Sequence, residues 1–77
     1  MIRRYKPIPL PTGKIPISEM RLGDYFCAKI PHLKDDGYEN RICRLIEIHE
    51  PILRVQTSTR KDLVPISRKD ITSLAWR

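Results

Sequence analysis

The chain has 77 residues, which suffices for one domain at most, because a chain of this length buries only about 60% of the surface it exposes when unfolded. It carries 15 Lys and Arg against 9 Asp and Glu, a net charge of +6, and two cysteines. Length excludes a second core, and two cysteines exclude the dense disulfide framework of small secreted domains. Because no apolar run is long enough for a signal-peptide core or a membrane span, we expect a cytoplasmic protein with no membrane partner.

The first 17 residues differ in character from the rest. They contain no acid and carry a charge of +4, whereas residues 18–77 hold 11 basic and 9 acidic side chains. Proline fixes φ near −65° and removes a backbone donor, so it excludes a helix here. We therefore predict an extended, proline-rich basic arm over residues 1–17, with prolines and apolar anchors at Pro7, Ile8, Pro9, Leu10, Pro11, Ile15, Pro16 and Ile17.

The pattern of residues 18–77 predicts a series of short strands. Apolar residues alternate in the first of them, where Phe26, Ala28 and Ile30 form one face. Asp36 and Gly37 then predict a hairpin turn in which glycine takes positive φ. We expect strands over residues 24–30, 41–49, 52–57, 62–66 and 71–76.

Two local features refine this reading. The second strand alternates imperfectly, because Arg44 interrupts the parity of Ile42, Ile46 and Ile48, and a β-bulge or burial on both faces would account for it. Ser67 is placed to cap a tight turn before the last strand. Five short strands at roughly ten-residue spacing predict an all-β fold, a small five-stranded SH3-like barrel.

Within that class the chain resembles a Tudor-type domain over residues 21–76. The residues that carry the resemblance are Gly23 and Asp24 opening a strand, Ala28 within it, the Asp36–Gly37 turn, and the strand, turn and strand ending of residues 63–74. Tudor domains bind methylated lysine or arginine in an aromatic cage. The cage positions fall here on Ile30, Asn40 and residues 58–60, so the resemblance implies the fold without that site.

The spacing of Cys27, His32, Cys43 and His49 invites a zinc interpretation. Strand geometry opposes it, since six residues of one strand place Cys43 and His49 roughly 20 Å apart. The two histidines and the adjacent Asp35 and Asp36 offer no nucleophile with a base, and no phosphate-binding glycine loop is present. We expect no metal, no cofactor, no small-molecule substrate and no enzymatic activity.

The function we expect is a protein-interaction module, or a small subunit of a larger protein or nucleoprotein assembly. A proline-rich arm is already extended, so it docks at low entropic cost in a groove or along a sheet edge. The candidate partner-binding residues are Arg3, Arg4, Tyr5, Lys6, Ile8, Leu10, Lys14 and Trp76.

The alternative is a nucleic-acid-binding module that contacts the phosphate backbone of RNA or DNA. Tyr5, Tyr25, Tyr38 or Trp76 would then stack on bases. Acids at Asp62 and Asp70 lie beside the basic pairs of two predicted turns, which also fits an ordinary solvated surface. The candidate phosphate contacts are Arg3, Arg4, Lys6, Lys14, Arg60, Lys61, Arg68 and Lys69. Sequence leaves open the partner's identity, the oligomeric state and a Cys27–Cys43 disulfide.

Overall fold

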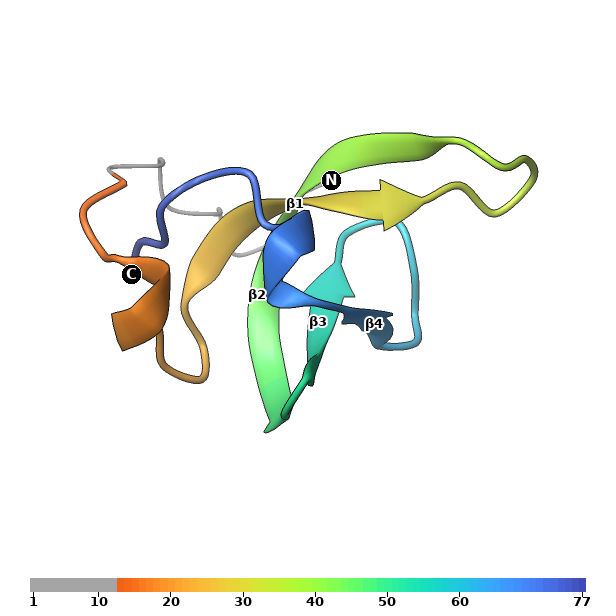
Figure 1. Ribbon diagram of the computed structural model, residues 1–77. Helices are drawn as coiled ribbons and strands as arrows, with labels where there is room; N and C mark the ends of the chain where they lie inside the picture. Colours follow the sequence, from red (N-terminus) through yellow and green to blue (C-terminus); the bar gives the residue numbers. More distant parts are fainter. Residues whose placement is uncertain (1–12) are drawn as a thin grey trace, which may run out of the picture.

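The computed structural model describes residues 13–77 and confirms the all-β class. Its centre is a four-stranded antiparallel sheet in the order β1-β2-β3-β4 (Figure 1). The strands are β1 (Tyr25–Pro31), β2 (Tyr38–His49), β3 (Ile52–Thr57) and β4 (Val64–Ile66). Two single 3-10 turns, η1 (Ile17–Glu19) and η2 (Arg68–Asp70), precede and follow the sheet, and neither is long and apolar enough to cross a membrane.

The β1–β2 hairpin is longer than the sequence predicted. β2 begins at Tyr38, whereas the predicted strand began at residue 41. Tyr38 pairs with Pro31 at the end of β1. Figure 1 shows this hairpin reaching past β3 and β4. Polar residues at the start of β2 resemble a loop in the sequence, yet they continue the backbone ladder.

The turn of this hairpin is built around a side chain. The Asp35 carboxylate accepts the Gly37 N–H at 2.9 Å, and the His32 N–H donates to the Gly37 carbonyl at 2.9 Å. The predicted positive φ at Gly37 is wrong, because Gly13 and Gly23 are the glycines with positive φ in residues 13–77. Glycine serves close approach here, since a Cβ at position 37 would lie 3.1 Å from Asp35 Oδ1 and 3.2 Å from His32 Nδ1.

The predicted bulge in β2 is confirmed. The register with β3 shifts between Leu45 and Glu47, which leaves Ile46 as the additional residue. Cys43 and Leu45, rather than Ile42, face the interior, and Arg44 is exposed on the opposite face. The core also contains Met20, Phe26, Ala28, Ile30, Leu53, Val55, Val64, Ile66 and Ala75.

The C-terminal segment lies along the free edge of β1 without forming a regular strand. Ile71 opposes Ala28 and Trp76 opposes Tyr25, so the register slips by two residues between these bridges. Where it slips, the Ser73 hydroxyl accepts the Cys27 N–H at 2.9 Å in place of a backbone carbonyl. The predicted strand over residues 71–76 is therefore a set of isolated bridges, and a five-stranded barrel is not confirmed.

The turn before this segment has the predicted polar cap. The Ser67 N–H donates to the Asp70 carboxylate at 3.0 Å, and the Ser67 hydroxyl lies 3.2 Å from the same oxygen. This pairing fixes η2 at the exit of β4. The chain is thereby turned back toward β1.

Candidate binding clefts between two loops

Two adjoining clefts lie between the β1–β2 loop (residues 32–37) and the β3–β4 loop (residues 58–63). We name them the apolar cleft, of about 350 Å³, and the polar cleft, of about 320 Å³. Leu33, Thr59 and Arg60 line both, so the two clefts are neighbours with a shared wall. Loops held by a rigid sheet are common places for binding residues.

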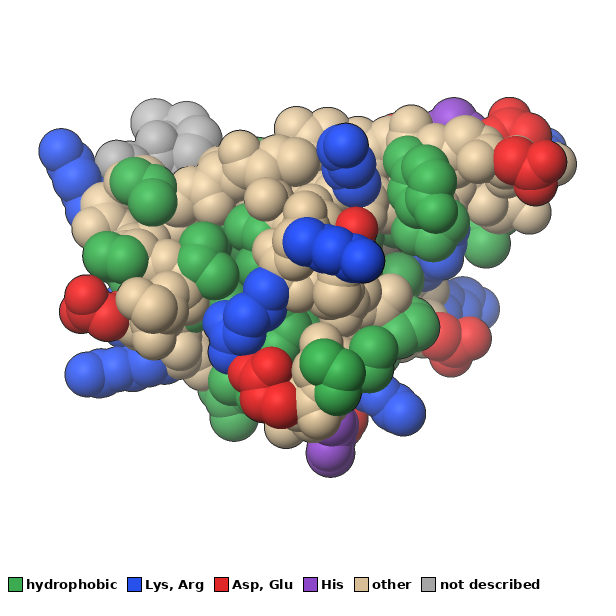
Figure 2. Space-filling view, in the orientation of Figure 1, with side chains coloured by type: hydrophobic (Ala, Val, Ile, Leu, Met, Phe, Trp, Pro, Cys, Tyr) green, Lys and Arg blue, Asp and Glu red, His purple; other side chains and the backbone are tan. Residues whose placement is uncertain are grey.

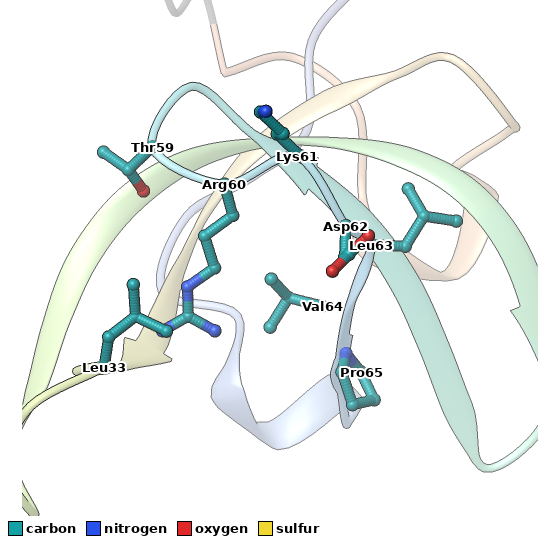
Figure 3. A pocket seen from close by; sticks show the side chains of 8 residues that line it. All are labelled: Leu33, Thr59, Arg60, Lys61, Asp62, Leu63, Val64 and Pro65. Carbon is teal, nitrogen blue, oxygen red and sulfur yellow. The ribbon is translucent and has the colours of Figure 1, made fainter.

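The apolar cleft combines side chains from both loops and from β4. Leu33 is 77% exposed, although the removal of a leucine side chain from water is favourable. Leu63, Val64 and Pro65 line the other side; Val64 and Pro65 lie across from Leu33, with Arg60 between them, and the Leu63 side chain points outward (Figure 3). Pro65 has no N–H to donate and lies on the edge strand, where proline is tolerated.

Arg60 lies at the boundary between the clefts. Its guanidinium donates a hydrogen bond to the carbonyl of Pro31, which fastens the β3–β4 loop to the end of β1. Figure 3 shows the Arg60 side chain pointing toward Leu33, whereas the neighbouring Lys61 points away from the cleft. Of two adjacent basic residues, one therefore belongs to the cleft and the other extends outward.

The polar cleft contains a short network of charged side chains. His32 Nδ1 lies 2.7 Å from Asp35 Oδ1, and His32 Nε2 lies 3.7 Å from Glu39 Oε2. Arg41 holds Glu39, with Nε 2.8 Å from Oε1 and a terminal nitrogen 3.0 Å from Oε2. Both carboxylates of the network thus already have partners.

These contacts shift the acidities of the network. The backbone N–H of Gly37, followed by the His32 side chain, holds the pKa of Asp35 below its usual value. The hydrogen bond from Arg41 lowers the pKa of Glu39 and raises the pKa of Arg41 itself. Both carboxylates are therefore charged at neutral pH and occupied by local donors.

The sheet explains why charged residues gather here. Glu39 pairs with Ile30 and Arg41 pairs with Ala28, so both lie on the side of β2 that buries Cys43 further along. Ile30 and Ala28 are buried in the core, but β3 pairs with β2 from Cys43 onward, so Glu39 and Arg41 have a neighbouring strand on one side, β1. The same face of one strand therefore changes from core to cleft wall.

Of the predicted partner-binding residues the structure describes Lys14 and Trp76, which flank the bridge between Ile15 and Ala75. Arg3, Arg4, Tyr5, Lys6, Ile8 and Leu10 lie outside the described residues. Lys14 is exposed beside Ile15, which exchanges two backbone hydrogen bonds with Ala75, of 3.0 and 2.8 Å. Trp76 is 1% exposed and stacks on Tyr25 with ring centroids 6.0 Å apart, so its side chain is packed inside the domain.

The predicted basic turns separate. Arg60 and Lys61 flank the clefts, whereas Arg68 is held by the Glu50 carboxylate and Lys69 is exposed on η2. Tyr38 is 64% exposed at the start of β2. Leu33, Glu39 and Arg41 were not predicted as cleft residues. The one signal for Leu33 was its position as an apolar residue in an otherwise polar turn.

The four residues of the zinc interpretation do not form a cluster. Among residues 13–77, no group of three or more His, Cys, Asp or Glu side chains is arranged to hold a metal ion. Both cysteines are free. Phe26 pairs with Cys43, so the adjacent Cys27 points to the other face of the sheet.

Comparison with known proteins finds no matching family model, no matching curated protein and no matching solved structure.

Proposed function

We propose that this chain is a small, non-catalytic protein-interaction module, or a subunit of a larger assembly, that docks through its basic arm and through the two clefts. The observation that carries the proposal is the pair of adjoining clefts with an exposed leucine on their shared wall. Apolar pockets with a few polar groups at the margin are typical of recognition sites. In Figure 2, Lys and Arg side chains are spread over one face with hydrophobic side chains exposed between them.

The base of the arm supports a docking role. Ile15 is anchored to Ala75 by two backbone hydrogen bonds, so the chain preceding it starts from a fixed point on the domain. Gly13 has a φ of 62°, a conformation that permits a change of direction there. The arm therefore joins the domain at a defined point, beside Lys14.

We also propose that the sheet and its C-terminal bridges together form an SH3-like barrel of the Tudor type without an aromatic cage. The bridges from Ile71 and Trp76 to β1 support this, since they bring the C-terminal segment to the free edge of the first strand of the sheet. Free thiols at both cysteines fit a reducing cytosol as the compartment.

The test is partner capture from the native source with the full chain and with residues 1–12 removed, after nuclease treatment. The deletion ends before Ile15 and Ile17, which pack against the core. We expect a protein partner that survives nuclease and that is lost or strongly depleted on deletion. A control chain with Arg3, Arg4, Lys6 and Lys14 changed to glutamine separates charge from the rest of the arm. Capture of nucleic acid alone would overturn the proposal.

Nucleic-acid binding is the second candidate. It is favoured by Lys34, Arg60 and Lys61, which form no ion pair among the described residues. If the four basic residues of the arm each neutralise one phosphate, log K against log salt has a slope of about −3.6. Affinity then falls roughly 100-fold between 50 and 200 mM salt. A protein interface with apolar anchors is expected to respond far less.

A further inference from the structure

We infer that the two clefts together bind a protein segment in which an acidic side chain neighbours an apolar one. The inference rests on the proposed function, and it names the class of partner. The apolar cleft receives the apolar side chain, and the polar cleft receives the carboxylate. Arg60, at the shared wall, contacts both.

The apolar half follows from burial. Leu33 is the most exposed large hydrophobic residue of residues 13–77, at 77%, and it lines a cleft of about 350 Å³ together with Leu63, Val64 and Pro65. An aliphatic side chain placed there removes apolar surface of Leu33 and Pro65 from water. A polar ligand group would gain no hydrogen bond from these four side chains.

The acidic half follows from which charges already have partners. Asp35 accepts hydrogen bonds from Gly37 and is paired with His32, and Glu39 is paired with Arg41. Among the ion pairs of residues 13–77 neither Lys34 nor Arg60 takes part. Arg60 nevertheless acts on Glu39, because its charge helps to lower the pKa of that carboxyl. Over the whole lining of the polar cleft, Lys34, Arg41 and Arg60 exceed Asp35 and Glu39 by one positive charge. A guanidinium has five N–H groups, and the bond to Pro31 leaves others for a ligand carboxylate.

The order of the two side chains follows from the position of the cations. Lys34 lines the polar cleft, where Asp35 and Glu39 already have the partners His32 and Arg41. Lys61 points away from the apolar cleft, which Asp62 also lines (Figure 3). The acidic side chain is therefore placed beyond Arg60, beside Lys34. Because the clefts share a wall, the two ligand side chains must be close neighbours in an extended segment.

The same charges disfavour the ligands of the family that the sequence resembles. A methylated lysine or arginine is a cation, and it would meet Lys34, Arg60 and Lys61 without an aromatic ring in the lining of either cleft. The inferred ligand has the opposite sign. The distinction makes charge reversal of the ligand a decisive control.

The test uses a synthetic extended peptide that alternates glutamate and leucine, labelled for fluorescence anisotropy, with the full-length protein. Two control peptides replace glutamate by lysine and leucine by serine. Arg60→Gln and Leu33→Ser are each expected to weaken binding roughly 10-fold, the loss of one charge-assisted hydrogen bond or one apolar contact. The matched controls are Arg21→Gln and Leu22→Ser, which change an exposed arginine and a 62% exposed leucine outside the clefts.

Arg60 also fastens a loop, so Lys34→Gln is the second charge variant, and thermal unfolding is recorded for each protein. We expect Lys34→Gln to weaken binding with an unchanged unfolding curve. Equal binding of the lysine peptide, or wild-type affinity in Leu33→Ser and Lys34→Gln, would overturn the inference. Partner capture by arm deletion does not involve these residues, so the inference and the proposed function can fail separately.

Discussion

Two stretches of strand β2 share one face of the sheet and yet differ in role. Around Cys43 and Leu45 that face is buried to 1% and 0% exposure, whereas around Glu39 and Arg41 it carries a paired acid and base at the wall of a cleft. The difference arises because β3 pairs with β2 from Cys43 onward, so the earlier stretch of β2 is paired with β1 alone in the sheet. It teaches that stability and recognition occupy successive segments of one strand, and each can be altered while the other is kept.

The largest expected effect comes from emptying the core. Phe26 is 0% exposed, and Phe26→Ala is expected to cost about 3–5 kcal/mol of the free energy of unfolding. A core of this size supplies roughly 3–5 kcal/mol in total, so the variant should be unfolded at room temperature by circular dichroism. Leu33→Ala, in the cleft, should stay within about 0.5 kcal/mol of wild type by denaturant titration. A loss above about 1 kcal/mol in Leu33→Ala would erase the distinction between the two segments.

A smaller loss is expected from the buried acid at the start of β1. Asp24 is 3% exposed, and its carboxylate accepts the Arg21 N–H at 2.8 Å and pairs with Arg77 Nε at 3.0 Å. Asp24→Ala should cost about 1.5–3 kcal/mol, because hydrogen bonds to a charged group are lost. Asp36→Ala, in the exposed hairpin turn, is the matched control and should stay within about 0.5 kcal/mol. Equal effects in a urea titration would contradict this ranking.

The reactivity of the two cysteine thiols tests whether the Cys43 segment of β2 belongs to the core. Burial, the largest cause, raises the pKa of the Cys43 thiol to about 12, so at pH 8 it is protonated and a poor nucleophile. Iodoacetamide should label the half-buried Cys27 first, giving a single adduct by mass spectrometry, and both cysteines in urea. The raised pKa also means that stability falls as pH rises from the ordinary thiol value of 9.0 toward 12. Labelling of Cys43 in the folded protein would show that this segment is not core.

The smallest effect lies in the polar cleft. Arg41→Gln should raise the pKa of Glu39 toward its ordinary value of 4.5, as followed by carbon-13 NMR of the carboxyl groups. The pKa of Asp35, lowered by Gly37 and His32, should not change and serves as the control. Because both pKa values are lowered on folding, the stability they contribute is present at neutral pH. It is lost as pH falls below 4.5 for Glu39 and below 3.8 for Asp35. An unchanged Glu39 pKa would mean that Arg41 does not hold this carboxylate.

Much of the sheet was predictable from alternation and breakers. The strand at residues 52–57 is confirmed at both ends. A bulge in β2 is confirmed too, but it lies at Ile46, because Arg44 and Ile42 share the exposed face without a break in parity. The first three residues of β2, Tyr38 to Asn40, were missed, since Glu39 and Asn40 carry no apolar signal although their backbone pairs with β1. Backbone pairing is set by the partner strand, which local composition does not reveal.

The clefts could not be predicted from the sequence. Leu33 and Arg60 belong to different loops, and they meet because two hairpins of particular lengths end at the same side of the sheet. The prediction of Trp76 as a partner-binding residue has a related explanation. A tryptophan near the end of the sequence resembles an exposed anchor, but its bridge to Tyr25 places it in the core.

The central claim is that recognition takes place in the clefts while the core segment of β2 remains unchanged. Its most direct test is a nitrogen-15 NMR titration of the full-length protein with the peptide that alternates glutamate and leucine. The account predicts that amide shifts change at residues 32–34 and 59–64, with little change at Cys43 and Leu45. Shifts concentrated elsewhere on the sheet, or an equal response to the lysine peptide, would contradict it.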